Sequence, residues 1–170
     1  KNIRGIAKAK SEIIENIETG GTIVLNRDDK FFNYLFKKAR SYNLNTLSFG
    51  KHTKSDIRLI RIIKGKVFSK IYININNQII SFRYKDLNVY NILASLCVLK
   101  AFKINFLRII SKFKYLESPE GRGKKYLISR YDKKFQLIDE SYNANPLSVK
   151  NAINNFDLIK KEKFKKFLIL

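Results

Sequence analysis

Two kinds of hydrophobic periodicity follow one another along this chain and restrict it to a mixed α/β fold. Residues 1–19 and 30–42 carry apolar side chains at helical spacing, whereas 22–26 and 46–49 are short apolar segments of strand length. This alternation of helix and strand is typical of a sheet with parallel strands. Asp28-Asp29 precedes the second helix, where negative charge is favourable, so we expect this pair to start it.

The middle of the chain changes to a β-rich pattern. Apolar segments separated by turn residues predict an antiparallel β-meander over 56–64, 67–75 and 79–84. Apolar stripes at helical spacing then predict two helices, over 88–102 and 104–113.

Residues 117–123 contain one Pro and two Gly and predict a domain boundary. We therefore expect one domain over 1–116 and a second over 117–170. In the second domain the pattern predicts two short strands, a helix and a final strand, over 125–130, 135–138, 146–156 and 164–170.

The composition limits the classes of function. The chain has 170 residues with 35 Lys+Arg against 14 Asp+Glu, a net charge of +21, and 45% hydrophobic residues. That apolar content excludes a disordered polyelectrolyte, and no apolar run approaches the ~20 residues of a membrane-spanning helix. The charge makes a basic nucleic-acid-binding module one candidate. Lys, Asn and Ile are all abundant, however, which is also the bias of an AT-rich genome.

Single residues with reactive side chains are poor candidates for a site. His52 is the only histidine and Cys97 the only cysteine, so neither a metal cluster nor a disulfide can form from them. Cys97 lies in an apolar helical segment and is expected in the core. The chain contains no Walker-type phosphate loop and no GxGxxG segment.

Two segments carry polar groups suited to a nucleotide. Asn88 and Asn91 stand at a predicted helix start; Asn88 is an N-cap candidate, and a pair of amides can also read the edge of an adenine. Arg122 lies between Gly121 and Gly123, either in an ordinary linker or as a contact to phosphate or ribose.

A third segment, residues 138–146, follows a predicted strand and precedes a helix, which is where α/β sheets bind ligands. Its run Asp-Glu-Ser-Tyr-Asn-Ala-Asn-Pro resembles the signature of the UDP-N-acetylmuramoyl-tripeptide:D-alanyl-D-alanine ligases, in the Mur ligase family. Three further segments resemble that family in the same order: Ile6–Ile13, Val24–Asp29 with its Leu-Asn-x-Asp-Asp end, and Asn88–Ala94.

The resemblance implies a fold and an activity. Residues 1–116 would be the distal half of a central ATP-binding domain, a mixed sheet with a β-meander and helices, and 117–170 the start of a Rossmann-like C-terminal domain. The family enzyme is a cytoplasmic ligase of peptidoglycan synthesis. It uses ATP and Mg²⁺ to activate the carboxylate of UDP-N-acetylmuramoyl-tripeptide as an acyl phosphate, which D-alanyl-D-alanine then attacks. It implies a monomer at full length, with no nucleic-acid partner.

Site residues follow from the same resemblance. It implies nucleotide contacts from Asn88, Asn91, Arg122 and Glu140, and a substrate-cleft loop formed by Ser141, Asn143 and Asn145. Asp86 and Leu87 depart from the family, which has Gly and His in these places.

The family's phosphate loop, modified lysine and metal-binding Glu and His precede the matched segments. We therefore expect this chain to be a fragment that holds no catalytic or metal-binding residue and is inactive alone, either a piece of a full-length enzyme or a remnant of a split gene.

Overall fold

The structure is a computed structural model that describes residues 2–65, 67–85, 88–142, 144–157, 159 and 165–169. Contacts divide the chain into two compact units, and the division falls between Leu116 and Glu117. In the described residues the first unit holds a five-stranded sheet with its helices, and the second holds a two-stranded sheet with an α-helix.

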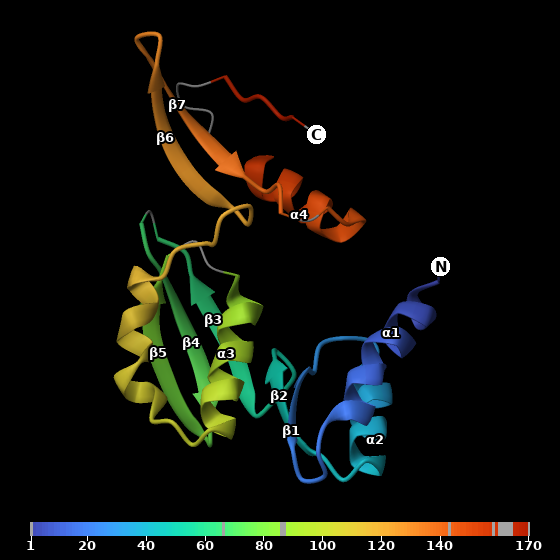
Figure 1. Ribbon diagram of the computed structural model, residues 1–170. Coiled ribbons are helices and arrows are strands. Elements are labelled where there is room, and N and C mark those ends of the chain that lie inside the picture. The colour runs from blue at the N-terminus through green and yellow to red at the C-terminus, as the bar shows by residue number, and fades with distance from the viewer. Residues whose placement is uncertain are drawn as a thin grey trace. The chain divides into compact units, whose positions relative to one another are not determined.

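The sheet of the first unit has the strand order β1-β2-β3-β4-β5 (Figure 1). Its strands span, in this order, Thr22–Asn26, Asn45–Gly50, Ile57–Ile63, Ser69–Ile75 and Gln78–Tyr84. β1, β2 and β3 are parallel, whereas β3, β4 and β5 form an antiparallel meander. The turn from β4 to β5 is Asn76-Asn77, with φ of 51° and 62°, the left-handed conformation that a two-residue hairpin turn requires. The predicted mixed α/β class is confirmed.

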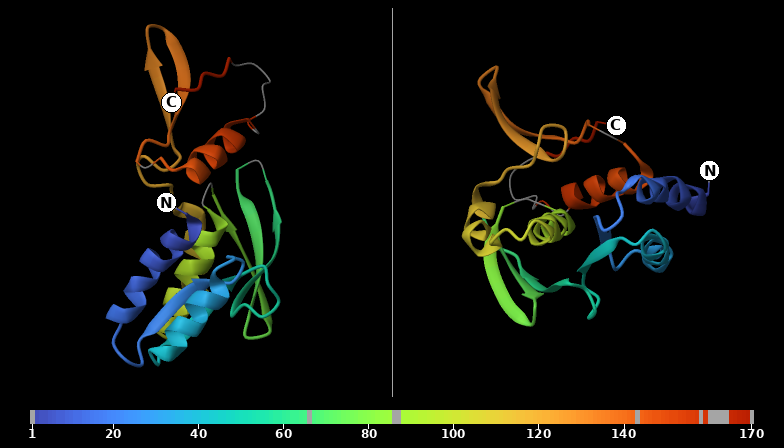
Figure 2. Two further views of the ribbon diagram at one scale, coloured as in Figure 1. Left: turned by 90° about the vertical axis from the view of Figure 1, so that its right-hand side faces the viewer. Right: turned by 60° about the horizontal axis from the view of Figure 1, so that its bottom comes forward.

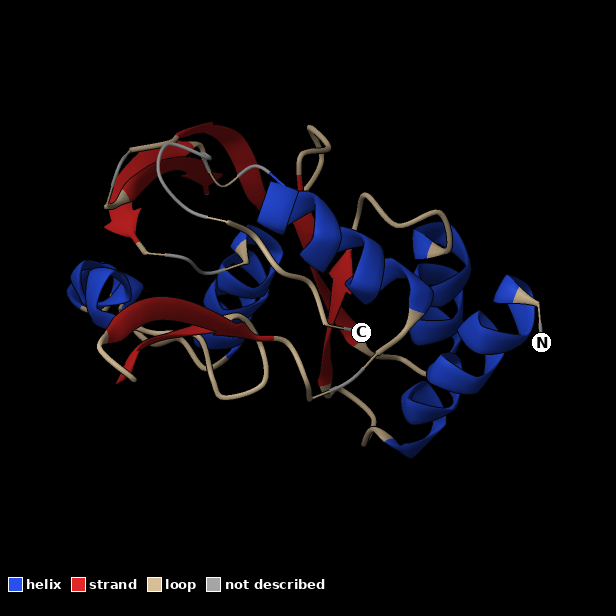
Figure 3. Ribbon diagram, turned by 90° about the horizontal axis from the view of Figure 1, so that it is seen from above, coloured by secondary structure: helices blue, strands red, loops and turns tan. Residues whose placement is uncertain are grey.

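Helices cover both faces of β1 and β2. α2 (Phe32–Ser41) connects these two strands, and α3 (Val89–Ala101) packs on their other side, so that the strands lie between the two helices (Figures 1 and 3). Neighbouring residues of β1 confirm this, because Ile23 packs with the α2 cluster and Val24 with the α3 cluster. No helix in the described part of the chain combines the length and the apolar character needed to cross a bilayer.

The N-terminal helix is shorter than predicted. An α-helix, α1, covers Ile3–Ser11, and a 3₁₀ segment continues it over Glu12–Asn16. The buried Ser11 hydroxyl donates to the carbonyl of Lys8 and competes with the helical pattern, and the β-branched pair Ile13-Ile14 follows it. α1 and α2 lie side by side (Figure 2), joined by the hydrogen bond between Ser11 and Tyr34, and the Lys38–Glu15 ion pair joins α2 to the 3₁₀ segment.

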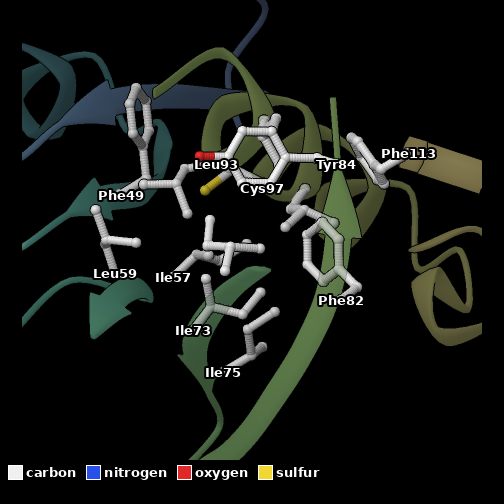
Figure 4. Packing of buried hydrophobic residues seen from close by; sticks show 13 residues of the cluster. Phe49, Ile57, Leu59, Ile73, Ile75, Phe82, Tyr84, Leu93, Cys97 and Phe113 are labelled. Atoms are coloured by element: carbon white, nitrogen blue, oxygen red, sulfur yellow. The ribbon is translucent and has the colours of Figure 1, made fainter. Parts of the chain in front are cut away.

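The main core of the first unit lies between the meander and α3 (Figure 4). Its buried members come from β2 to β5, α3 and a 3₁₀ segment: Phe49, Ile57, Leu59, Ile71, Ile73, Ile75, Phe82, Tyr84, Ile92, Leu93, Leu96, Cys97 and Phe113. Alternate residues of β4 point into it, as expected for a strand with one buried face.

The helix predicted over 104–113 is replaced by two 3₁₀ segments, Phe106–Arg108 and Ile110–Tyr115. α3 ends where Lys103 takes a positive φ of 55°. The following segment then brings the ring of Phe113 to 5.2 Å from that of Phe82, a docking that outweighs the weak helix preference of its β-branched and aromatic residues.

The second unit begins with a hairpin of β6 (Lys124–Arg130) and β7 (Lys133–Asp139), followed by α4 (Pro146–Asp157). These elements agree with the predicted strands and helix. The final strand predicted over 164–170 is wrong for its described residues, 165–169, which are irregular. A strand needs a partner to satisfy its backbone groups, and no described strand pairs with this segment.

Candidate functional site

Asp28 joins three segments at the carboxyl ends of β1 and β2. The two strands end level with each other, since Asn26 pairs with Phe49. The Asp28 carboxylate accepts hydrogen bonds from the backbone N–H of Lys51 at 2.7 Å and of His52 at 3.0 Å, both just after β2. It also accepts one from the Tyr90 hydroxyl, in the first turn of α3, at 2.8 Å. The side chain therefore connects the start of α3 to the edge of the parallel strands.

The prediction that Asp28 and Asp29 together start the second helix is wrong for Asp28. Asp29 does shape that turn, because its carboxylate accepts from the backbone N–H of Phe31 at 2.7 Å, and α2 begins at Phe32. Asp28 points instead to residues 23, 24 and 62 positions away. Composition at a helix start cannot reveal such distant partners.

The electrostatics of the Asp28 site follow from these bonds. Reduced contact with water raises the pKa of the Asp28 carboxyl, but the hydrogen bonds from Lys51, Tyr90 and His52 outweigh this, and the pKa lies below its usual value. Burial and the bond to Asp28 raise the pKa of Tyr90. Gly50 has a φ of +145°, and a Cβ there would lie 2.7 Å from the Asp28 carboxyl atoms, so the site needs glycine at this position.

The predicted amide pair lies on the first turn of α3, next to Tyr90. Asn88 is the N-cap: its side-chain oxygen accepts from the backbone N–H of Tyr90 at 2.9 Å and of Asn91 at 3.4 Å. Only the NH₂ of Asn88 is left for a ligand. Asn91 is exposed, and within the described residues its side-chain amide has no hydrogen-bond partner, so it offers both a donor and an acceptor.

A second cluster forms within the second unit around Asp139, at the end of β7. The Asp139 carboxylate accepts from the backbone N–H of Gly121 at 3.1 Å and of Ser141 at 3.0 Å. The bonds from Ser141 and Gly121 hold the pKa of Asp139 below its usual value. Sequence reasoning did not select this residue. The sequence feature that could have identified Asp139 is its position as the last residue of a strand, directly before the polar loop.

Three predicted site residues belong to the Asp139 cluster. Arg122 lies over the ring of Tyr142, with its Cζ 4.3 Å from the ring centroid. Gly121 and Gly123 have φ of +69° and +84°, and a Cβ on Gly123 would lie 3.2 Å from the Glu140 carboxylate. Partial burial and the adjacent Asp139 raise the pKa of Glu140. Ser141 completes the cluster through its bond to Asp139.

The remaining predicted residues divide into a capping residue and one outside the described part of the chain. The side-chain oxygen of Asn145 accepts from the backbone N–H of Ser148 at 3.0 Å, and the Ser148 hydroxyl accepts from the Asn145 N–H at 3.0 Å, a reciprocal cap of α4. Asn143 lies outside the described residues, as do Asp86 and Leu87. The cleft roles of Ser141, Asn143 and Asn145 stay predictions.

Neither a metal-ion site nor a reactive cysteine is found among the described residues. Among the described residues, no group of three or more His, Cys, Asp or Glu side chains is placed to hold a metal ion. Cys97 is fully buried in the main core, and this burial raises the pKa of its thiol to about 12. The prediction that Cys97 is a core residue is confirmed.

Comparison with known proteins shows which family the chain belongs to. Residues 1–99, more than half of the chain, match the Mur ligase middle domain. The chain belongs to the Mur ligase family. The resemblance noted in its motifs is therefore confirmed.

Three relatives illustrate what this Mur ligase chain is similar to. The UDP-N-acetylmuramoyl-tripeptide--D-alanyl-D-alanine ligase of Buchnera aphidicola subsp. Acyrthosiphon pisum is 29% identical over 160 residues, 90% of this chain and 34% of the relative. A MurF structure from Acinetobacter baumannii superposes with a TM-score of 0.76 at 22% identity, over 92% of this chain and 34% of that one. MurF ligase from Thermotoga maritima, in complex with ADP, gives 0.70 at 24% identity, over 89% and 34%.

The chain thus spans about a third of the length of these relatives. The structural similarity shows that the fold is shared. The match to the middle domain includes the Asp28 site, because Asp28, Gly50, Tyr90 and Asn91 all lie within residues 1–99.

Proposed function

We propose that this chain is part of a UDP-N-acetylmuramoyl-tripeptide–D-alanyl-D-alanine ligase. Residues 1–116 would form the distal part of its central ATP-binding domain and 117–170 the first part of its C-terminal domain. The reaction is an ATP-dependent amide bond formation in the cytoplasm. ATP converts the tripeptide carboxylate into an acyl phosphate, and the amine of D-alanyl-D-alanine displaces the phosphate. The name and the 29% identity of the Buchnera relative support this proposal.

The observation that carries a nucleotide role is the Asp28 site. Ligands of α/β sheets bind at the carboxyl ends of parallel strands, where loops and helix starts converge. Here Asp28 holds the first turn of α3 at that edge through Tyr90, and Asn91 presents an unused amide from the same turn. An amide offers one donor and one acceptor, which complements the N6–H and N7 of adenine. We assign Asn91 to the adenine and the NH₂ of Asn88 to a supporting contact.

The remaining proposed groups come from the second unit. Arg122 is the cation suited to a phosphate, because its guanidinium donates several N–H groups in a fixed plane. Glu140 is assigned to the ribose hydroxyls, and Ser141, Asn143 and Asn145 to the substrate loop. The Mg²⁺ that such a reaction needs is assigned to residues of the family's upstream segments, and none of the described residues is assigned to it.

A nucleotide titration tests the adenine assignment. ADP is added to the isotope-labelled chain, and backbone amide signals are followed by NMR at constant ionic strength. We expect saturable shifts in the first turn of α3 with ADP and weaker effects with GDP. Asn91→Ala should lower ADP affinity by roughly 3- to 10-fold, the effect of about one lost hydrogen bond. Asn33→Ala, an exposed asparagine on α2, is the matched control and should leave affinity unchanged.

A chimaera tests the ligase assignment separately. Residues 1–170 replace the matching segment of the Buchnera relative, and phosphate release is measured with ATP, UDP-N-acetylmuramoyl-tripeptide and D-alanyl-D-alanine. Phosphate release that requires both UDP-N-acetylmuramoyl-tripeptide and D-alanyl-D-alanine supports the assignment. A chimaera that folds and binds ADP but releases no phosphate contradicts it.

A further inference from the structure

The Tyr90 side chain attaches the first turn of α3 to the ends of both β1 and β2. In the sequence Tyr90 comes directly before Asn91, in the same turn. Its hydroxyl donates to the Asp28 carboxylate at 2.8 Å, and Asp28 lies two residues after β1. Its ring packs edge-on against that of Phe49 in β2, with the ring centroids 6.3 Å apart. One side chain thus makes both contacts.

The acceptor of this hydrogen bond is itself held in place. The two oxygens of the Asp28 carboxylate accept from the backbone N–H groups of Lys51 and His52. Both donors are backbone groups, so their positions do not depend on a flexible side chain. Gly50 permits the close approach, because a Cβ there would lie 2.7 Å from the carboxyl atoms. The Tyr90 hydroxyl therefore meets an oxygen whose position is fixed by its neighbours.

The Asn91 side chain has no comparable support. Asn91 is exposed, and within the described residues its side-chain amide has no hydrogen-bond partner, so its position depends on the backbone of its turn. Val89 packs partly buried against the main core, and the fully buried residues of α3 begin at Ile92. Apolar contacts are non-directional, whereas a hydrogen bond restricts orientation. The Tyr90 bond is thus the contact that can set the orientation of this turn.

We propose that Tyr90 is a positioning residue for nucleotide binding. Its bond to Asp28 sets the orientation of the first turn of α3 and, with it, the place of the Asn91 amide. This inference rests on the proposed contact between Asn91 and adenine. It also couples the loop after β2 to the nucleotide, because Lys51 and His52 share the Asp28 carboxylate with Tyr90. Binding coupling is reciprocal, so a bound nucleotide should in turn strengthen these bonds.

Tyr90→Phe tests the proposal, because it removes the hydroxyl and keeps the ring. ADP is titrated into the isotope-labelled variant, and the backbone amide signals are followed by NMR. We expect ADP affinity to fall roughly 2- to 5-fold, within the effect of one hydrogen bond. In the Asn91→Ala background the same change should have little further effect, because both changes act on one contact. Additive losses would show that Tyr90 does not act through Asn91 and would overturn the proposal.

Tyr34→Phe is the matched control. It also removes a tyrosine hydroxyl that makes a tertiary hydrogen bond in the first unit, to Ser11 at 3.2 Å, but on α2 rather than α3. It should leave ADP affinity unchanged. Equal losses in Tyr34→Phe and Tyr90→Phe would show a general loosening of the unit and overturn the proposal. Asp28→Ala removes the acceptor and, as a second variant, should weaken ADP binding at least as much as Tyr90→Phe.

Amide hydrogen exchange provides a measurement that needs no nucleotide. In Tyr90→Phe the amides of Ile92, Lys51 and His52 should exchange several-fold faster, while that of Leu96 in the middle of α3 should not change. Unchanged exchange at the first three would contradict the positioning role.

The proposed function and the positioning role fail in different ways. A wild-type chain that does not bind ADP contradicts the proposed function and, with it, this role of Tyr90. A chain that binds ADP equally well with and without the Tyr90 hydroxyl contradicts the positioning role alone.

Discussion

The Asp28 carboxylate should stabilise the first unit more than its neighbour Asp29 does. Asp28 accepts three hydrogen bonds, from Lys51, His52 and Tyr90, whereas the Asp29 side chain accepts one, from Phe31. A net hydrogen bond contributes about 0.5–1.5 kcal/mol, and both carboxylates are exposed, so the low end applies. Asp28→Ala should therefore cost about 1.5 kcal/mol and Asp29→Ala about 0.5 kcal/mol of unfolding free energy.

Urea unfolding measures this difference. Amide NMR signals of β1, β2 and α3 report the first unit alone, and the midpoint should move while the slope with urea stays constant. Asp29→Ala is a matched control because each variant removes one exposed acid from a chain of net charge +21, so general charge effects cancel. Equal costs for the two variants would refute the conclusion that Asp28 braces the strand ends.

The pH dependence gives the same prediction an independent check. The pKa of Asp28 is lowered in the folded protein. A depressed folded-state pKa stabilises the protein above the unfolded value of about 3.9, and this contribution is lost as pH falls through the folded value. The gap between wild type and Asp28→Ala should thus be full at pH 7 and shrink below about pH 4. If the difference in unfolding free energy between wild type and Asp28→Ala does not change with pH, the ionised Asp28 carboxylate is not the source of the stabilisation.

Three further predictions concern other positions. Gly50→Ala should cost about 1–3 kcal/mol in urea unfolding, because the new Cβ would meet the Asp28 carboxyl at 2.7 Å in a backbone conformation that L-residues avoid. Ile73→Ala, at a fully buried position of β4, should cost about 2–5 kcal/mol by the same assay, and a smaller loss would mean that the core collapses around the cavity. Cys97 should resist iodoacetamide at pH 8 in the folded chain and react in urea, since its pKa of about 12 leaves little thiolate; fast labelling of folded chain would contradict its burial.

Periodicity and segment length were a good guide to β1 and α3. β1 agrees with the predicted 22–26, and α3 differs from its prediction by one residue at each end. In both, packing and local preference point to the same structure. The prediction failed over 104–113, because apolar residues at helical spacing there are held by the docking of Phe113 on Phe82 rather than by a helix.

The site shows a different limit of sequence reasoning. Asn88 and Asn91 could be placed together from the sequence because a helix brings residues three apart onto one face. The contact between Asp28 and Tyr90 could not, because 62 residues separate them and only the crossing of α3 over the strand ends brings them together. Asp28 and Asp29 differ little in sequence, and their separate roles arise from which backbone N–H groups the fold directs at each.

The hydrogen-bond partners of the acidic residues help to explain why so many basic side chains lack an ion pair. The chain has 14 acidic against 35 basic side chains, and the described residues contain two ion pairs, Lys38–Glu15 and Lys124–Glu120. Several aspartates instead hold loops by accepting backbone N–H bonds: Asp28, Asp29, Asp56 and Asp139. Acids used in this way leave the surrounding cations with few partners. The resulting surplus of cations attracts anions in general, so the net charge of +21 does not by itself indicate a nucleic-acid partner.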